Sequence, residues 1–445
     1  MTKQIDMLNG DIKITLIKIS LPIILTNLIQ TALGMFDMIW VGRLGSNAVS
    51  AIGTASFYVN LATAVSTIIT VGAAVLVAQA LGSEDKKEAR LITKNALFLS
   101  VLISVLFSVV VSMNSKQLLS FFGIKEFIIL RMANDYLQVS LIGVPFLFLV
   151  STYTSVFTSY GNTKETFRAN SIGLVINLVL DPIFIFGFSI FPALGVSGAA
   201  WTNNIARIIT LVLLVLNSNS EINSSFRERM KIDKVLRIFK LSFPVTAQRI
   251  LFIFISMIMT RIIVRFGSEA IAVQKIGVQI ESISYVTVGG LQGAVAAFVG
   301  QNYGAKNIDR IDKGYGISLR LVFFFGILIS SVFIVFPKQI FGIFISEPNV
   351  INSGVEYMRV IGYSQLFMCI ELLTVGAFNG IGKTYAPPII SIIFTLGRIP
   401  LALLLSEYLG LSGVWWSISI SSILKGIGLY IWFKMTMRKE KLQNE

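Results

Sequence analysis

Three oxygen-bearing side chains stand inside apolar stretches of this sequence and could bind a cation. Asp37 lies within GMFDMIWVGRLG (residues 34–45), a run that is otherwise almost wholly apolar. Asn177 and Asp181 are four residues apart in INLVLDPIF, a spacing that places both side chains on one helix face, one turn apart. A carboxylate in hydrocarbon is costly unless it is paired, protonated or facing a cavity. The pattern therefore predicts a site that binds and releases a proton or a hard cation such as Na+.

The composition indicates that these residues lie in a membrane. Only 13% of the 445 residues are charged, against about one quarter in a soluble domain, and the mean hydropathy is +0.78. The chain has no histidine and one cysteine, Cys369, which excludes histidine-based catalysis, an intrachain disulfide and a cysteine metal cluster. The net charge of +14 is explained by basic cytoplasmic loops, so nucleic acid is not an expected partner.

Twelve apolar stretches are long enough to cross a bilayer, for which about 20 residues are needed. The first is too long for a cleavable signal sequence. The predicted spans are 16–41, 50–80, 91–113, 130–157, 167–187, 195–217, 238–264, 270–301, 314–337, 354–380, 386–406 and 411–434. The fold class expected is therefore an all-α, multi-pass membrane protein.

Basic residues fix the predicted orientation of these spans. Lysine and arginine are concentrated in the segments after spans 2, 4, 6 and 8 and at the C-terminus, whereas the alternate loops are short or sparsely charged. By the positive-inside rule, both termini are expected to be cytoplasmic, in the inner (plasma) membrane of the cell.

The two halves of the sequence repeat each other. LGSNAVSAIG (44–53) recurs as FGSEAIAVQKIG (266–277), and LGVSGAAW (194–201) recurs as LGLSGVWW (409–416). One constant offset in the numbering, 222, relates Pro22 to Pro244, Gly45 to Gly267, Gln79 to Gln301 and Gly82 to Gly304, and Tyr136 pairs with Tyr357 at an offset of 221. This repeat predicts an N-terminal lobe of six spans (1–217), a cytoplasmic linker (218–237) and a C-terminal lobe of six spans (238–445).

Each predicted lobe contains an even number of spans, so the lobes have the same orientation in the membrane. Parallel repeats about an axis near the membrane normal are found in transporters whose substrate path lies between two lobes. Pseudo-twofold symmetry between the lobes is therefore expected.

Several motifs together resemble the multidrug and toxic compound extrusion (MATE) family. They are LPIILTNLIQTALGMFDMIWVGRLG near the start, AVSAIG after it, LDPIFIFGF in span 5 and GVSGAAWTNN entering span 6, with the mirrored pattern in the second half. The resemblance covers about residues 10–436. It implies a two-lobed secondary transporter, monomeric, that exports organic cations and amphipathic drugs in exchange for Na+ or H+, with no cofactor beyond this ion.

The resemblance also implies a cation site in the N-terminal lobe. Asp37, Asn177 and Asp181 match its positions in spans 1 and 5, and Thr202 matches a threonine at the start of span 6. Carboxylate, amide and hydroxyl oxygens suit Na+, so these four residues are the expected Na+ ligands, although protonation of Asp37 would serve equally well.

The second half carries its own charges within its spans. Glu281 lies in span 8, Glu371 in span 10 and Arg398 in span 11 near Pro400. Some MATE branches carry an essential acid in span 7, but this span has no carboxylate. Glu281 and Glu371 are expected to pair with arginine or lysine and stabilise the lobe, since buried charges are usually paired. A role for either acid in binding substrate stays open.

Other functions fit the sequence less well. A flippase for lipid-linked precursors, from a related superfamily with a similar fold, is the main alternative, and Arg249, Arg261 and Arg398 favour it. A passive channel or receptor would not need duplicated lobes. An enzyme is not expected, because the sequence shows no paired acids of a soluble cleft, no metal cluster and no nucleophile arrangement. An ATPase is not expected either, because AFNGIGKT (377–384) lacks the first glycine of a phosphate-binding loop and follows an apolar helix rather than a strand.

Overall fold

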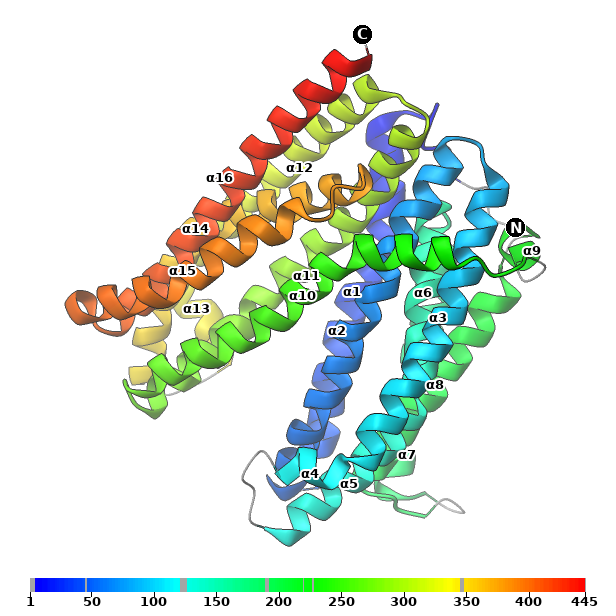
Figure 1. Ribbon diagram of the computed structural model, residues 1–445. Coiled ribbons are helices and arrows are strands. Elements are labelled where there is room, and N and C mark those ends of the chain that lie inside the picture. The colour runs from blue at the N-terminus through cyan, green and yellow to red at the C-terminus, as the bar shows by residue number, and fades with distance from the viewer. Residues whose placement is uncertain are drawn as a thin grey trace. The chain divides into compact units, whose positions relative to one another are not determined.

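The computed structural model describes residues 5–44, 46–120, 126–188, 192–218, 220–225, 228–344 and 348–444, apart from some side chains, among them those of 32–39. This part of the chain forms sixteen helices and no strand (Figure 1). The helices are α1 (Ile12–Gly42), α2 (Ser46–Gly82), α3 (Lys86–Met113), α4 (Ser115–Ser120), α5 (Phe127–Ile142), α6 (Val144–Ser159), α7 (Thr163–Phe186), α8 (Val196–Leu216), α9 (Ser220–Ser224), α10 (Ile232–Val264), α11 (Ser268–Gly304), α12 (Ile308–Val335), α13 (Pro337–Gly342), α14 (Pro348–Gly380), α15 (Ala386–Leu409) and α16 (Leu411–Asn444).

The predicted all-α membrane fold is confirmed. Among the described residues, eleven helices are long and apolar enough to cross a bilayer, and a twelfth span forms if α5 and α6 are taken together. These two helices meet at an angle of 47°, so the fourth span, predicted as one stretch over 130–157, is broken.

The break in the fourth span has a local cause. Pro145 has no N–H to continue the helical ladder, and the backbone N–H of Gly143 bonds to Ser140 O at 2.9 Å. Two carbonyls near the bend are bonded by side chains of neighbouring helices: Asn204 Nδ2 donates to Val139 O at 2.7 Å, and Ser108 Oγ donates to Leu141 O at 2.9 Å. A broken helix is tolerated in a membrane when its polar backbone groups find such partners.

The repeat seen in the sequence recurs in the helix boundaries. Helices α2 and α11 begin and end at positions related by the same offset of 222, as do α3 and α12, and α4 and α13. The continuous α14 matches α5 and α6 together at an offset of 221. Even two non-glycine residues with left-handed backbone, Glu84 (φ +58°) and Lys306 (φ +57°), are related by the offset of 222. The two halves therefore share one local fold.

The chain packs into two compact units, which do not coincide with the sequence halves. Unit 1 contains Leu25–Ser242, and unit 2 contains Asp6–Ile24 with Phe243–Glu445. Helix α1 therefore contributes its first turns to unit 2, and α10 contributes its first turns to unit 1. The changes of unit fall close to Pro22 and Pro244, which occupy equivalent positions in the repeat.

Within each unit, a few helix pairs position the charged side chains. In unit 1, α7 lies along α8, and α8 also contacts α5 and α6. In unit 2, α14 contacts α11, α12 and α16, and α15 lies along α16 (Figure 1). Of the polar residues singled out from the sequence, five lie on these paired helices and are at most 8% exposed: Asn177, Asp181, Thr202, Glu371 and Arg398.

Candidate ion and substrate sites

Unit 1 brings together three of the four residues predicted to bind a cation. Thr202 Oγ1 on α8 donates a hydrogen bond to Asp181 Oδ1 on α7. Asn177 Nδ2, one turn earlier on α7, lies 3.5 Å from Asp181 Oδ1 and 3.3 Å from Thr202 Oγ1. All three side chains are at most 3% exposed. The packing of α7 along α8 therefore creates a buried polar cluster of one carboxylate, one amide and one hydroxyl.

The hydroxyl of Thr202 can serve this cluster in two ways. Besides Asp181, it lies 3.0 Å from the carbonyl oxygen of Ala199, one turn earlier on α8. A hydroxyl has one proton, so it donates to only one of these acceptors at a time. Donation to Ala199 O would turn an oxygen lone pair of Thr202 toward a cation bound beside Asp181.

The chemistry of the donor set restricts which ion it could hold. No group of three or more His, Cys, Asp or Glu side chains suited to a metal ion occurs in the described part of the chain. Carboxylate, hydroxyl and amide oxygens are ligands of hard cations, whereas transition metals favour imidazole and thiolate. The cluster suits Na+ or a proton.

The fourth predicted residue, Asp37, lies on α1, but its side chain is outside the described residues. The helix turn that follows it is described. The Trp40 ring packs edge-on against Phe186 of α7, with 6.2 Å between ring centroids, and Val41 belongs to the same hydrophobic cluster as Ile185. The end of α1 is therefore attached to the end of α7, near the helix turn after Asp181.

Unit 2 contains a second buried polar cluster. Glu371 on α14 forms an ion pair with Lys425 on α16, with 3.1 Å between Oε2 and Nζ, and its other oxygen accepts a hydrogen bond from Ser391 Oγ at 3.3 Å. Both charged residues are at most 7% exposed. The expected pairing of Glu371 with a basic residue is confirmed.

The expected pairing of Glu281 with a basic residue is wrong for the described residues. Glu281 on α11 accepts a hydrogen bond from the hydroxyl of Tyr357 on α14, and no described basic side chain lies within 4.0 Å of it as an ion-pair partner. Arg398 on α15 donates from Nε to Ser421 Oγ on α16 at 2.9 Å. The hydroxyl of Tyr357 satisfies the acid in place of a cation, because α14 packs directly along α11.

Sequence reasoning assigned no role to Tyr357 or to Ser421. The only available signal was the repeat, which pairs Tyr357 with Tyr136. That signal marks a shared position in the fold and does not identify a hydrogen-bond partner.

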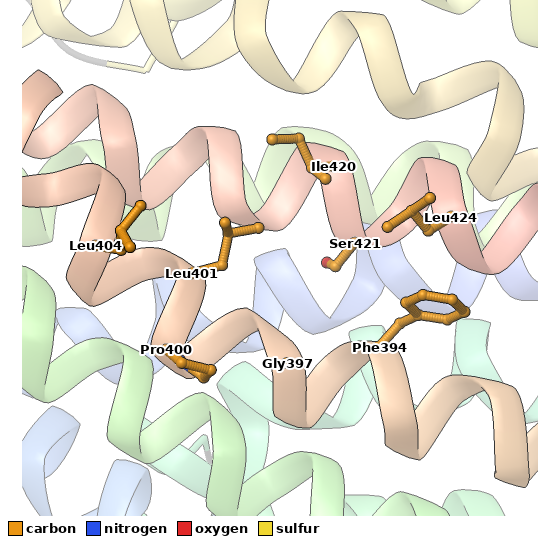
Figure 2. Close-up of a pocket in the computed structure, with 8 residues that line it drawn as sticks. All are labelled: Phe394, Gly397, Pro400, Leu401, Leu404, Ile420, Ser421 and Leu424. Carbon is orange, nitrogen blue, oxygen red and sulfur yellow. The ribbon is translucent and has the colours of Figure 1, made fainter.

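Two hollows lie beside this second cluster. A polar pocket of about 160 Å³ is lined by residues of α10, α11, α14, α15 and α16, including Tyr285, Glu371 and Lys425. An apolar groove of about 400 Å³ runs between α15 and α16, and Figure 2 shows its lining residues. Ser421, the hydrogen-bond partner of Arg398, is the one hydroxyl-bearing residue in the groove lining. Arg398 therefore lies beside the groove wall.

Comparison with known proteins shows that the chain matches a protein family. The sequence profile of the MatE family matches the chain twice, over residues 22–183 and 244–404. The two matches begin at Pro22 and Pro244, and so repeat at the offset that relates equivalent helices. Together they cover more than half of the chain.

Individual relatives match nearly the whole length. The probable multidrug resistance protein NorM of Thermotoga maritima is 27% identical over 415 residues, which cover 91% of this chain and 88% of NorM. The FAD transporter of Shewanella oneidensis is 25% identical over 439 residues, 95% of each chain. A solved outward-facing multidrug resistance MATE transporter of the MOP superfamily has a TM-score of 0.91 at 22% identity, over 99% of both chains. The similarity to this structure establishes the shared fold.

Proposed function

Because the chain belongs to the MatE family, whose members are transporters and not enzymes, we propose that it is a secondary active multidrug efflux transporter. It exchanges Na+ or H+ for organic cations and amphipathic drugs by alternating access. The names of relatives such as the Thermotoga maritima protein support the drug substrates.

The buried cluster of Asn177, Asp181 and Thr202 is the observation that carries the ion-coupled part of this proposal. Burying a carboxylate away from water costs several kcal/mol unless a proton or a cation neutralises it. The amide of Asn177 and the hydroxyl of Thr202 can each orient toward a carboxylate or toward a cation. Reversible neutralisation of Asp181 is therefore the chemistry that these residues support.

Helix register supports the inclusion of Asp37 in the same site. In the proposed topology, α1 and α7 are the first and fifth spans and so run in the same direction. Val41 and Ile185 belong to one hydrophobic cluster, and Asp37 and Asp181 each lie four residues, about one helix turn, before these contact residues. This equivalent register favours Asp37 as a further ligand of the same cation or proton.

The proposed cycle follows from competition for these acids. A cation entering from outside neutralises Asp37 and Asp181, which rearranges the N-terminal lobe and releases drug outward. After the ion leaves, the free carboxylates favour binding of a cationic drug from the cytoplasm or inner leaflet. The ion and the drug thus stabilise different conformations of the same protein. The oxygen set of Asn177, Asp181 and Thr202 favours Na+, and H+ is the second candidate.

The remaining assignments follow from this function. The protein is a multi-pass membrane protein, and we place it in the plasma membrane as a monomer with both termini in the cytoplasm, where the basic loops are attracted. Residues 1–217 and 238–445 are the proposed functional lobes, joined by the linker 218–237. A lipid-precursor flippase is the second candidate function, because Arg398 has no ion-pair partner among the described residues.

Reconstituted transport tests the proposal. Efflux of a cationic dye such as ethidium is measured in proteoliposomes with an imposed Na+ gradient and, separately, a pH gradient. We expect one gradient to drive efflux by the wild type and Asp37→Asn to abolish it. Full activity of Asp37→Asn would refute the N-lobe mechanism and shift attention to Glu281 and Glu371. Absence of dye transport under both gradients would favour the flippase.

A further inference from the structure

Arg398 is a buried guanidinium with most of its hydrogen-bonding capacity unused. Its side chain is 8% exposed, and its Nε donates to Ser421 Oγ. The two terminal nitrogens have no hydrogen-bond or ion-pair partner among the described residues. A guanidinium carries five N–H donors, four of them on these terminal nitrogens. Neither terminal nitrogen is among the side-chain atoms that are fully buried without a partner, so these donors keep accessible surface and can bond to an acceptor from outside the described residues.

The nearby acids are bonded to other partners. Glu371 is held by Lys425 and Ser391, and Glu281 by the Tyr357 hydroxyl. Both acids act electrostatically on Arg398, but neither comes within 4.0 Å of it as an ion-pair partner. Their charges therefore make the burial of a cation tolerable without occupying its donors.

The polar pocket of unit 2 lies beside Arg398, which is not itself one of the lining residues. Tyr285 and Glu371, which interact electrostatically with Arg398, both line the pocket, and so does Thr395, one helix turn before Arg398 on α15. Lys425 adds an ammonium group to the lining. The remaining wall consists of two polar residues, Gln248 and Ser391, and five apolar ones, Leu251, Phe252, Ile255, Leu372 and Ile392.

The dimensions of the pocket define the size of the group that fits it. Sites for whole drug-sized ligands have volumes of about 300–1,000 Å³. A pocket of about 160 Å³ holds one small charged group with a short apolar neighbour. The rest of a larger molecule would extend beyond the pocket.

We propose that Arg398, with Lys425, binds a carboxylate or phosphate group of an amphipathic cargo molecule. The planar guanidinium offers two parallel N–H donors to such an anion, and this geometry is the reason that arginine is favoured for planar, bidentate recognition of oxyanions. The substrate class of the transporter then extends from cations to anionic and zwitterionic amphiphiles. The inference rests on the proposed function only in treating the bound molecule as cargo.

Equilibrium binding of a matched probe pair tests this site. Riboflavin and flavin mononucleotide share the ring system and ribityl chain and differ by one phosphate group. Their affinities are measured by flavin fluorescence with the full-length protein in nanodiscs of zwitterionic lipid. We expect the phosphorylated probe to bind about 10- to 100-fold more tightly, as a charge-assisted hydrogen-bonded pair provides.

Variants locate the source of this preference. Arg398→Gln should remove it, and Arg398→Lys should retain part of it because the charge remains without the planar fork. Arg320→Gln, which removes an exposed arginine of α12, changes the net charge equally and should leave the preference unchanged. A monodisperse profile in gel filtration shows that each variant is folded.

Two results would overturn the proposal: equal affinity of the wild type for both probes, or an unchanged preference in Arg398→Gln. Either result would leave Arg398 as a structural counter-charge for Glu281 and Glu371. The binding experiment uses no ion gradient, so a failure of ion-coupled efflux would not alter its result, and a failure here would leave the efflux proposal intact.

Discussion

Replacing Gly143 with alanine should destabilise unit 1 by removing the space that Asn204 occupies. A Cβ atom at position 143 would lie 1.7 Å from Asn204 Oδ1 and 2.5 Å from its Cγ. The backbone itself would accept alanine, since φ at Gly143 is −82°. The steric clash with Asn204, and not backbone strain, is therefore the reason that Gly143→Ala should lower the stability.

The magnitude follows from three contributions. Forcing extra atoms into a packed site costs about 1–3 kcal/mol. Displacing Asn204 also breaks its 2.7 Å bond to Val139 O, and such an interhelical bond in a membrane contributes about 0.6–1.7 kcal/mol. The higher intrinsic helix propensity of alanine over glycine offsets at most about 1 kcal/mol of this loss. The net free energy of unfolding should fall by about 1–3 kcal/mol.

The single cysteine provides the assay. Cys369 is fully buried, so a thiol-reactive fluorophore labels the detergent-solubilised protein only as it unfolds on heating. The apparent midpoint of Gly143→Ala should lie several degrees below that of the wild type. Gly53→Ala is the matched control, because a Cβ there meets nothing within 4 Å, and its midpoint should be unchanged or higher.

A double-mutant cycle separates the clash from a general loss of helix stability. Once Asn204→Ala has removed the obstructing amide, adding Gly143→Ala should cost little, so the two changes should be strongly non-additive. Additive effects would refute the steric reasoning, and so would a wild-type midpoint in Gly143→Ala.

Two further predictions use the same thermal assay. Glu84→Gly and Lys306→Gly should each raise the midpoint of thermal unfolding. Both residues have φ near +57°, and a non-glycine residue in this left-handed region costs about 1–2 kcal/mol. A lower midpoint in both variants would contradict this reasoning. Lys425→Met should lower the free energy of unfolding by about 3–5 kcal/mol because it leaves Glu371 buried without its cation. The double variant with Glu371→Gln should recover most of this loss, and equal destabilisation of the single and double variants would argue against the ion pair.

The number and approximate limits of the membrane helices followed from the sequence, because a membrane span has a strong and local signal. A bilayer requires about 20 apolar residues in succession, and each predicted span corresponds to a helix or, for the fourth, to the pair α5 and α6. The constant offset between the two halves was equally visible, because it depends on the order of residues alone.

Contacts between helices could not be assigned in the same way. Sequence spacing placed Asn177 and Asp181 on one helix face, and the packing of α7 along α8 then brought Thr202 to them. The choice of Tyr357 as partner of Glu281, and of Lys425 for Glu371, depends on which helix faces meet in unit 2. The sequence shows that a buried acid needs a partner, but several candidates satisfy that requirement equally.

The central claim is that a coupling ion and a cationic drug compete for the buried carboxylates of unit 1. The most direct test is displacement of bound ethidium from the purified protein, followed by fluorescence while Na+ or, separately, acid is added. The wild type should release ethidium in response to one of these ions. Asp181→Asn, which keeps the shape of the side chain but not its charge, should lose this response, whereas Asp135→Asn, at an exposed position on α5, should retain it. Release from Asp181→Asn at the same ion concentration as from the wild type would contradict the claim.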